Sequence, residues 1–130
     1  MVNNCLFLDN AATTVASFRA FGGAISSSLG KLTVVDSIFK NNRAIQVDTT
    51  SGDGGGGAIY AFGGTGVDVL VLSSLFESNE ASNVGGAALL GNVGWYNNKE
   101  LLSGNDSGED CGGAKVVTGD CFNVTDNFSI

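Results

Sequence analysis

The chain repeats itself, and this periodicity constrains its fold more than any other feature of the sequence. Lys31–Ala44 aligns without a gap on Asp68–Ala81, 37 residues later, and Asn4–Ala12 aligns on Asp36–Ala44 at an offset of 32. These segments share the pattern Phe-x-x-Asn, and Trp95–Asn98 is interpreted as a fourth, weaker copy. A chain built from such copies is expected to stack one unit on the next.

A second motif, Gly-Gly-Ala, alternates with the first and begins at four positions: Gly22, Gly56, Gly85 and Gly112. Between the motifs lie β-branched runs without helical periodicity, of which Leu32–Val35 and Val69–Leu72 are the clearest predicted strands. If each strand recurs once per winding, its copies pair in parallel at a spacing of about 4.8 Å. The sequence therefore predicts an all-β parallel β-helix of about four coils.

Stacking predicts three kinds of column. The aromatic positions form an internal stack of Phe7, Phe39, Phe76 and Trp95. The amide positions form a ladder of Asn10, Asn42, Asn79 and Asn98. The offset of 37 also matches three residue pairs of opposite charge, which are Lys31 with Asp68, Lys40 with Glu77 and Arg43 with Glu80. Each such pair favours the correct register more than it adds stability.

Composition excludes several classes of function. The 130 residues fit a single domain, and a net charge of −7 disfavours binding to nucleic acid. The chain has no histidine, which removes the usual general base and the commonest metal ligand. No apolar run reaches the roughly 18 residues of a membrane helix, so we expect no membrane-spanning segment. We expect no catalytic residues and no cofactor.

The paired motifs resemble the repeats of the chlamydial polymorphic outer membrane proteins. The matching positions are Gly22–Ile25 with Phe39–Asn42, then Gly56–Ile59 with Phe76–Asn79. The resemblance implies a right-handed parallel β-helix that is displayed on the cell surface, and it implies a role in adhesion.

The C-terminal third departs from this pattern. Ala88 and Lys115 stand where the motif has isoleucine, and Phe122 is followed by Thr125 where asparagine is expected. Only 10 residues separate Gly85 from Trp95, a spacing that predicts a missing strand.

We therefore divide the chain into β-helix coils over 1–98 and a degenerate terminal coil with an acidic loop over 99–130, which could form a cap. The chain starts in the middle of a repeat, which suggests part of a longer protein or a subunit of a larger complex that covers the open end. The inserted loops Val47–Gly55 and Ser103–Asp110 are candidate binding loops.

One segment resembles a calcium-binding repeat. Gly63–Val71 fits the pattern Gly-Gly-x-Gly-x-Asp, with Asp68 as the candidate ligand. Such sites need successive copies, and Lys31 occupies the position equivalent to Asp68. We therefore expect no metal site.

Covalent modifications are suggested by two further features. Cys111 and Cys121 could form a disulfide that leaves Cys5 unpaired, although three reduced thiols are an equal alternative. Sequons for N-glycosylation begin at Asn105, Asn123 and Asn127. They favour an extracellular location.

Two classes of function remain. Pectate lyases and glycoside hydrolases also use parallel β-helices, and they carry clustered carboxylates on one face. Here Asp36 aligns with Ser73 and Glu77 with a lysine, so no carboxylate column emerges. We predict a non-catalytic structural or adhesive scaffold, extracellular or at the cell surface, with a protein or glycan partner. The alternative is a fragment of a carbohydrate-active β-helix protein.

Overall fold

Every regular element in the described part of the chain is a β-strand. The computed structural model describes residues 1–15, 19–28, 30–47, 55–62, 69–82, 86–91, 93–96, 99–100, 106–107, 114–116 and 121–122. Within these residues no helix is long and apolar enough to cross a membrane.

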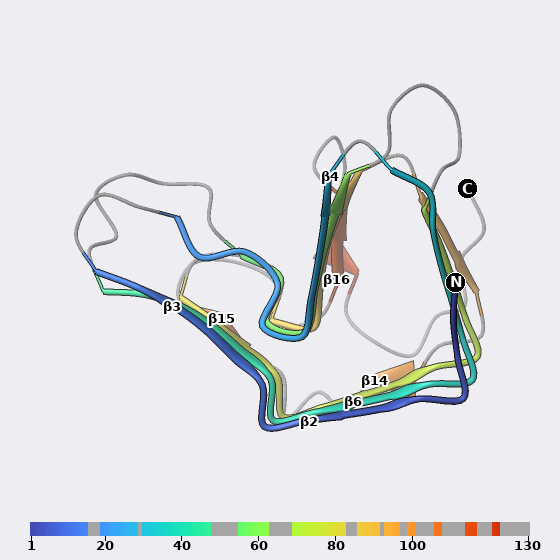
Figure 1. Cartoon of the computed structure of the whole chain (residues 1–130), viewed down its shortest axis with the longest axis horizontal. Helices are drawn as coiled ribbons and strands as arrows, with labels where there is room; N and C mark the ends of the chain where they lie inside the picture. The colour runs from blue at the N-terminus through green and yellow to red at the C-terminus, as the bar shows by residue number, and fades with distance from the viewer. Residues whose placement is uncertain are drawn as a thin grey trace.

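Each coil contributes one strand to each of four parallel sheets (Figure 1). Sheet 1 holds β1 (Val2–Asn3), β5 (Leu32–Val35), β9 (Val69–Leu72) and β13 (Val93–Tyr96). Sheet 2 holds β2 (Leu6–Leu8), β6 (Ile38–Lys40), β10 (Leu75–Glu77) and β14 (Lys99–Glu100). Sheet 3 holds β3 (Ala11–Thr14), β7 (Arg43–Gln46), β11 (Glu80–Ala81) and β15 (Asp106–Ser107). Sheet 4 holds β4 (Ile25–Ser28), β8 (Ile59–Phe62), β12 (Ala88–Gly91) and β16 (Ala114–Val116).

The predicted parallel β-helix is confirmed. Its strands run through the four sheets in a fixed order, four times in succession. The register follows the repeat, since Leu32 pairs with Val69 and Phe39 with Phe76. Seen from its N-terminal end, the chain turns clockwise as it recedes, which is a right-handed winding (Figure 1).

Sheets 1, 2 and 4 enclose the hydrophobic core, while sheet 3 runs outward as a flank (Figure 1). The core is one side chain deep because each strand alternates between its two faces. Its buried members are Leu32, Val34, Phe39, Ala58, Ile59, Ala61, Val71, Phe76, Ala87 and Ala88. Large side chains of sheets 1 and 2 therefore pack against alanines that lie in the strands of sheet 4 or directly before them. These small side chains let the sheets approach closely.

The first glycine of the Gly-Gly-Ala motif is required by its backbone conformation. Gly22 and Gly56 have φ angles of 60° and 72°, in the left-handed region. A side chain is costly there, and a Cβ on Gly22 would lie 1.9 Å from the carbonyl oxygen of Ile25. The tight turn into sheet 4 therefore depends on glycine.

The second glycine is required by a close approach between backbones. A Cβ on Gly57 would lie 2.0 Å from the carbonyl oxygen of Gly86 and 2.6 Å from that of Glu80. Gly23 is similarly confined, with the backbone nitrogen of Arg43 at 2.5 Å. The returning chain crosses the inside of the corner between sheets 2 and 3 only because no side chain stands there.

Two predictions about the C-terminal third are wrong. No strand is missing after Gly85, since β12 enters sheet 4 and β13 enters sheet 1 after a single intervening residue. The fourth Gly-Gly-Ala motif is also shifted by one residue. Ala114 pairs with Ala88 and Lys115 with Leu89, so Lys115 does not replace the motif isoleucine.

The last strand of the chain reverses direction. β17 (Cys121–Phe122) pairs antiparallel with β16 at the edge of sheet 4. An antiparallel strand covers a sheet edge without starting another coil. A capping role for 99–130 stays a prediction.

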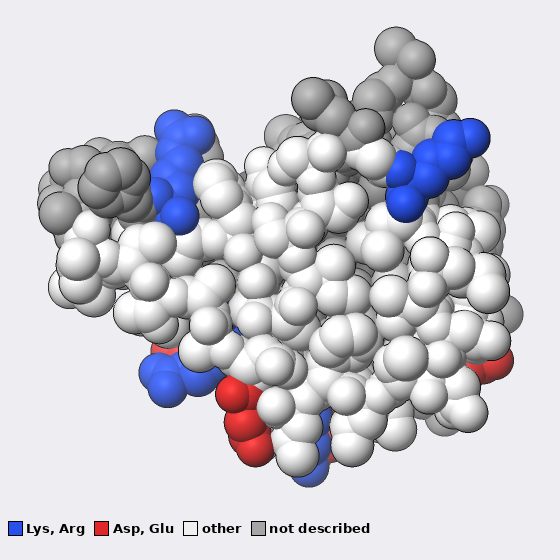
Figure 2. All heavy atoms as spheres, viewed as in Figure 1, with Lys and Arg blue, Asp and Glu red and all other residues white. Residues whose placement is uncertain are grey.

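The N-terminal end of the solenoid is uncharged over most of its area. Figure 2 looks onto this end and shows basic and acidic residues only around its margin. Val2, Phe7 and Ile25 are each partly exposed and pack against the core.

The space around the second motif glycine can be tested with a matched pair of alanine substitutions. Gly57→Ala should lower the free energy of unfolding by about 3 kcal/mol or more, because both obstructing atoms belong to the backbone. Gly30→Ala is the control, since its nearest neighbour is the Ser27 Oγ at 3.8 Å. It should change stability by no more than about 1 kcal/mol. Equal losses in urea-induced unfolding would contradict the close-approach explanation.

Candidate functional site

Three phenylalanines form a continuous column through the interior. The rings of Phe7 and Phe39 stack with centroids 4.7 Å apart, and those of Phe39 and Phe76 with centroids 4.9 Å apart. Their planes differ by 1° and 4°, so the rings lie parallel at nearly the strand spacing. Phe39 and Phe76 are fully buried. The column fills the interior, and only its first ring, Phe7, is partly exposed.

Trp95 does not continue this column, and its predicted place is wrong. Trp95 pairs with Val71 in sheet 1, whereas Glu100 pairs with Phe76 in sheet 2. The spacing between Trp95 and Asn98 predicted a place in sheet 2. Because the connection between β12 and β13 is short, Trp95 lies in sheet 1, one sheet earlier. Asn98 lies outside the described residues.

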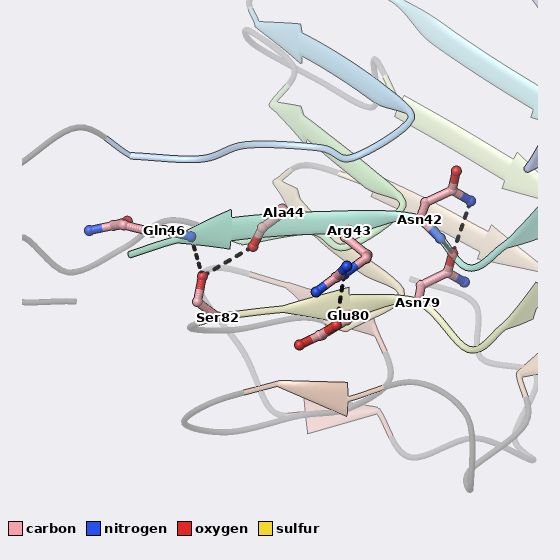
Figure 3. A network of polar contacts seen from close by, with 7 residues as sticks. All are labelled: Asn42, Arg43, Ala44, Gln46, Asn79, Glu80 and Ser82. Carbon is pink, nitrogen blue, oxygen red and sulfur yellow. Dashed lines mark hydrogen bonds and ion pairs between the residues drawn. The ribbon is translucent and has the colours of Figure 1, made fainter. Parts of the chain in front are cut away.

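The asparagines form a ladder at the corner between sheets 2 and 3. The Oδ1 of Asn42 accepts hydrogen bonds from the backbone nitrogen of Asn10 at 3.1 Å and from its Nδ2 at 2.9 Å. In the same way, the Oδ1 of Asn79 accepts hydrogen bonds from the backbone nitrogen and the Nδ2 of Asn42, both at 3.0 Å (Figure 3). In turn, the Nδ2 of Asn42 donates to the carbonyl oxygen of Phe7. Each asparagine therefore caps the backbone of the coil before it.

A serine ladder at the corner between sheets 1 and 2 escaped the sequence analysis. The Oγ of Ser74 accepts from the backbone nitrogen of Ser37, and the Oγ of Ser37 accepts from that of Cys5, both at 3.2 Å. Each serine also donates to the carbonyl oxygen two residues before it. The matched positions of Ser37 and Ser74 in the repeat could have indicated this role.

The same two corners contain residues in the left-handed region. Their φ angles lie between 47° and 56°, and they are Asn4, Asp9, Asp36, Asn41, Ser73 and Ser78. Asparagine and aspartate tolerate this conformation best among residues with a Cβ. The backbone conformation at these corners therefore accounts for the small polar residues that recur there, without a catalytic role.

Ion pairs link neighbouring coils on the outer surface. Lys40 lies 3.1 Å from Glu77. Arg43 lies 3.0 Å from Glu80 (Figure 3). All four side chains are at least partly exposed, so each pair contributes little stability. The third predicted pair, Lys31 with Asp68, involves a residue outside the described ranges.

A second feature missed by the sequence analysis is an aromatic pair on the outside of sheet 4. The rings of Phe21 and Tyr60 lie 4.2 Å apart and are tilted by 36°. Burial raises the pKa of the Tyr60 hydroxyl, and the nearby positive charge of Arg19 lowers it in part. Phe21 falls in neither repeated motif, so no pattern in the sequence pointed to this contact.

Several predicted site residues lie outside the described residues: Asp68, Cys111, Asn105, Asn123 and Asn127. The same holds for most of the two proposed binding loops. Cys5 is an exposed free thiol, and Cys121 begins β17. Among the described residues no three potential ligands gather around a metal position.

One comparison with known proteins identifies the repeat. Residues 36–61 match the Chlamydia polymorphic membrane protein (Chlamydia_PMP) repeat. This segment contains the second Phe-x-x-Asn and the second Gly-Gly-Ala motif, so the resemblance seen in the sequence is confirmed. No curated protein and no solved structure matches the chain.

The asparagine ladder predicts a large difference between two identical substitutions. Asn42→Ala should destabilise the protein by about 2–4 kcal/mol, because it leaves backbone groups of the preceding coil without partners. Asn10→Ala, at the exposed end of the ladder, should cost about 1 kcal/mol or less. Thermal or urea unfolding measures both, and equal costs would disprove the capping role.

The ion pair between Arg43 and Glu80 should behave as a weak, salt-dependent contact. A double-mutant cycle with Arg43→Gln and Glu80→Gln should give a coupling free energy below about 1 kcal/mol at low salt. The coupling should shrink further in 1 M NaCl, where the Debye length is about 3 Å. A coupling above about 2 kcal/mol that salt does not change would show that this surface pair determines the register.

Proposed function

We propose that this protein is a non-catalytic β-helix scaffold that is displayed at a cell surface and adheres to a partner through its outward faces. The repeat match at residues 36–61, to a family of membrane proteins of Chlamydia, supports a surface location. The partner is a protein or a glycan, bound without chemical change.

The observation that carries this proposal is the structural use of the buried polar residues. Ser37, Ser74, Asn42 and Asn79 are all buried, and each one bonds to the backbone of a neighbouring coil. A catalytic β-helix would instead expose clustered acids that act as general acid and base.

The described carboxylates argue in the same direction. Glu77 and Glu80 point outward, and each is paired with a basic residue of the preceding coil. A carboxylate that is engaged in such a surface ion pair is poorly placed to act as a general acid or base. The scaffold function also agrees with the uniform register of the sheets, because a rigid stack presents its outer rows at fixed spacing.

The proposal is tested by adhesion and turnover in parallel. Beads coated with the chain should bind cultured animal cells more than beads coated with an unrelated protein of equal net charge. The chain should release no product from polyuronates or other polysaccharides in lyase and hydrolase assays. Turnover would overturn the non-catalytic function, and adhesion equal to that of the control beads would overturn the adhesive one.

A further inference from the structure

The outer face of sheet 2 carries a row of aliphatic side chains that runs along the axis of the solenoid. Leu6 of β2 pairs with Ile38 of β6, and Ile38 pairs with Leu75 of β10, so the row repeats at the strand spacing of about 4.8 Å. The next residue of each strand belongs to the phenylalanine column of the interior. Because side chains alternate between the two faces of a strand, the aliphatic ones point outward. We call Leu6, Ile38 and Leu75 the aliphatic row.

The aliphatic row is open to solvent. Leu6 is 63% exposed, Ile38 is 41% exposed, and Leu75 is partly exposed. Ile38 lies between two neighbouring coils, so its exposure does not come from a place at the end of the solenoid. Sheet 2 forms the lower side of the coils in Figure 1, and no strand of the described chain lies below it. Contiguous exposed apolar side chains, unlike scattered ones, are typical of an interaction surface.

The regular spacing of the row indicates which partner fits it. Two sheets pack face to face about 10 Å apart, with the side chains of one between those of the other. Side chains that recur every 4.8 Å or so interdigitate best with a surface of the same period, and a second copy of this chain has that period. In such an isologous pair both copies use the same residues, which are related by a twofold axis.

Two opposite charges flank the row in the coil of Ile38. Lys40 follows Ile38 by two residues in β6, and Asp36 precedes it by two residues and is exposed at the corner between sheets 1 and 2. Within the described part of the chain, the Asp36 carboxylate takes part in no hydrogen bond or ion pair. The Lys40 ammonium contacts Glu77 and has three donors, so it can bind a second carboxylate.

These charges distinguish the two possible orientations of such a pair. A twofold axis along the aliphatic row makes the two solenoids parallel and places Lys40 of each copy opposite Asp36 of the other. A twofold axis across the row makes them antiparallel and places Lys40 opposite Lys40 and Asp36 opposite Asp36. Like charges that face each other cost free energy, so the parallel orientation is favoured.

We propose that two copies of this chain associate side by side and in parallel through the outer faces of sheet 2. The aliphatic rows meet at the centre, and Lys40 of each copy bridges its own Glu77 and Asp36 of the other copy. Three strands of three residues cover only about 10 Å by 14 Å, far less than the roughly 800 Å² that each partner of a stable dimer buries. The association is therefore weak in dilute solution. It becomes effective where copies are displayed together in one orientation, which raises their local concentration.

Self-association of the whole chain is measured by sedimentation equilibrium at low salt, between about 10 μM and 1 mM protein. The average mass should rise with concentration from 13.2 kDa towards the mass of a dimer, with a dissociation constant on the order of 0.1–1 mM. Ile38→Thr should raise this constant about tenfold, because each copy loses apolar contact. Val35→Thr is the matched control and should change nothing, since Val35 lies in the same coil on the outer face of sheet 1.

Charge reversal tests the orientation. Asp36→Lys and Lys40→Glu should each raise the dissociation constant about tenfold, because each brings like charges together twice in the parallel pair. The double variant keeps the net charge of −7 and restores opposite charges across the interface, so it should associate within about threefold of the unchanged chain. Circular dichroism melts establish that each variant is folded.

A chain that stays monomeric at the highest concentration would overturn the proposal, and so would equal association of Ile38→Thr and Val35→Thr. A double variant that associates no more tightly than the two single variants would overturn the parallel orientation. The inference goes beyond the adhesive function and does not depend on it, because sedimentation involves no other partner.

Discussion

The structure depends on one geometric constraint, the stacking of each coil on the next at the spacing of parallel strands. Because the spacing is constant, a side chain that packs well on its own copy packs well in every coil. The phenylalanine column shows this directly, with ring centroids 4.7 and 4.9 Å apart. The glycine pairs follow from the same constraint, since the returning chain must stay within contact of the next coil.

The polar ladders give the stack a direction. The side chain of Asn79 satisfies the backbone of Asn42, and that of Asn42 satisfies Asn10, so each corner is completed by the coil that follows it. The serines at the other corner have the same polarity. A buried amide with all its groups engaged is both a strong structural restraint and a poor starting point for catalysis.

Sequence alone could predict what recurs at a constant offset. The aligned segments gave the sheet register, the Phe7–Phe39–Phe76 column and the asparagine ladder because each residue was compared with its own copy. Trp95 was misplaced because connection lengths between sheets vary, which a motif spacing does not reveal. The contact of Phe21 with Tyr60 joins two residues that belong to different parts of the repeat, so no periodic pattern contains it.

Charged positions follow a different rule from apolar ones. Identical charges stacked about 4.8 Å apart would repel by about 1 kcal/mol even in water, so a repeated lysine or glutamate is unfavourable where a repeated phenylalanine is favourable. The chain places Lys40 on Glu77 and Arg43 on Glu80 instead. Electrostatic repulsion therefore disfavours the repetition of a charged side chain at outward positions, whereas packing favours the repetition of apolar side chains in the interior. Outward-facing side chains can therefore change without disturbing the columns that hold the coils together.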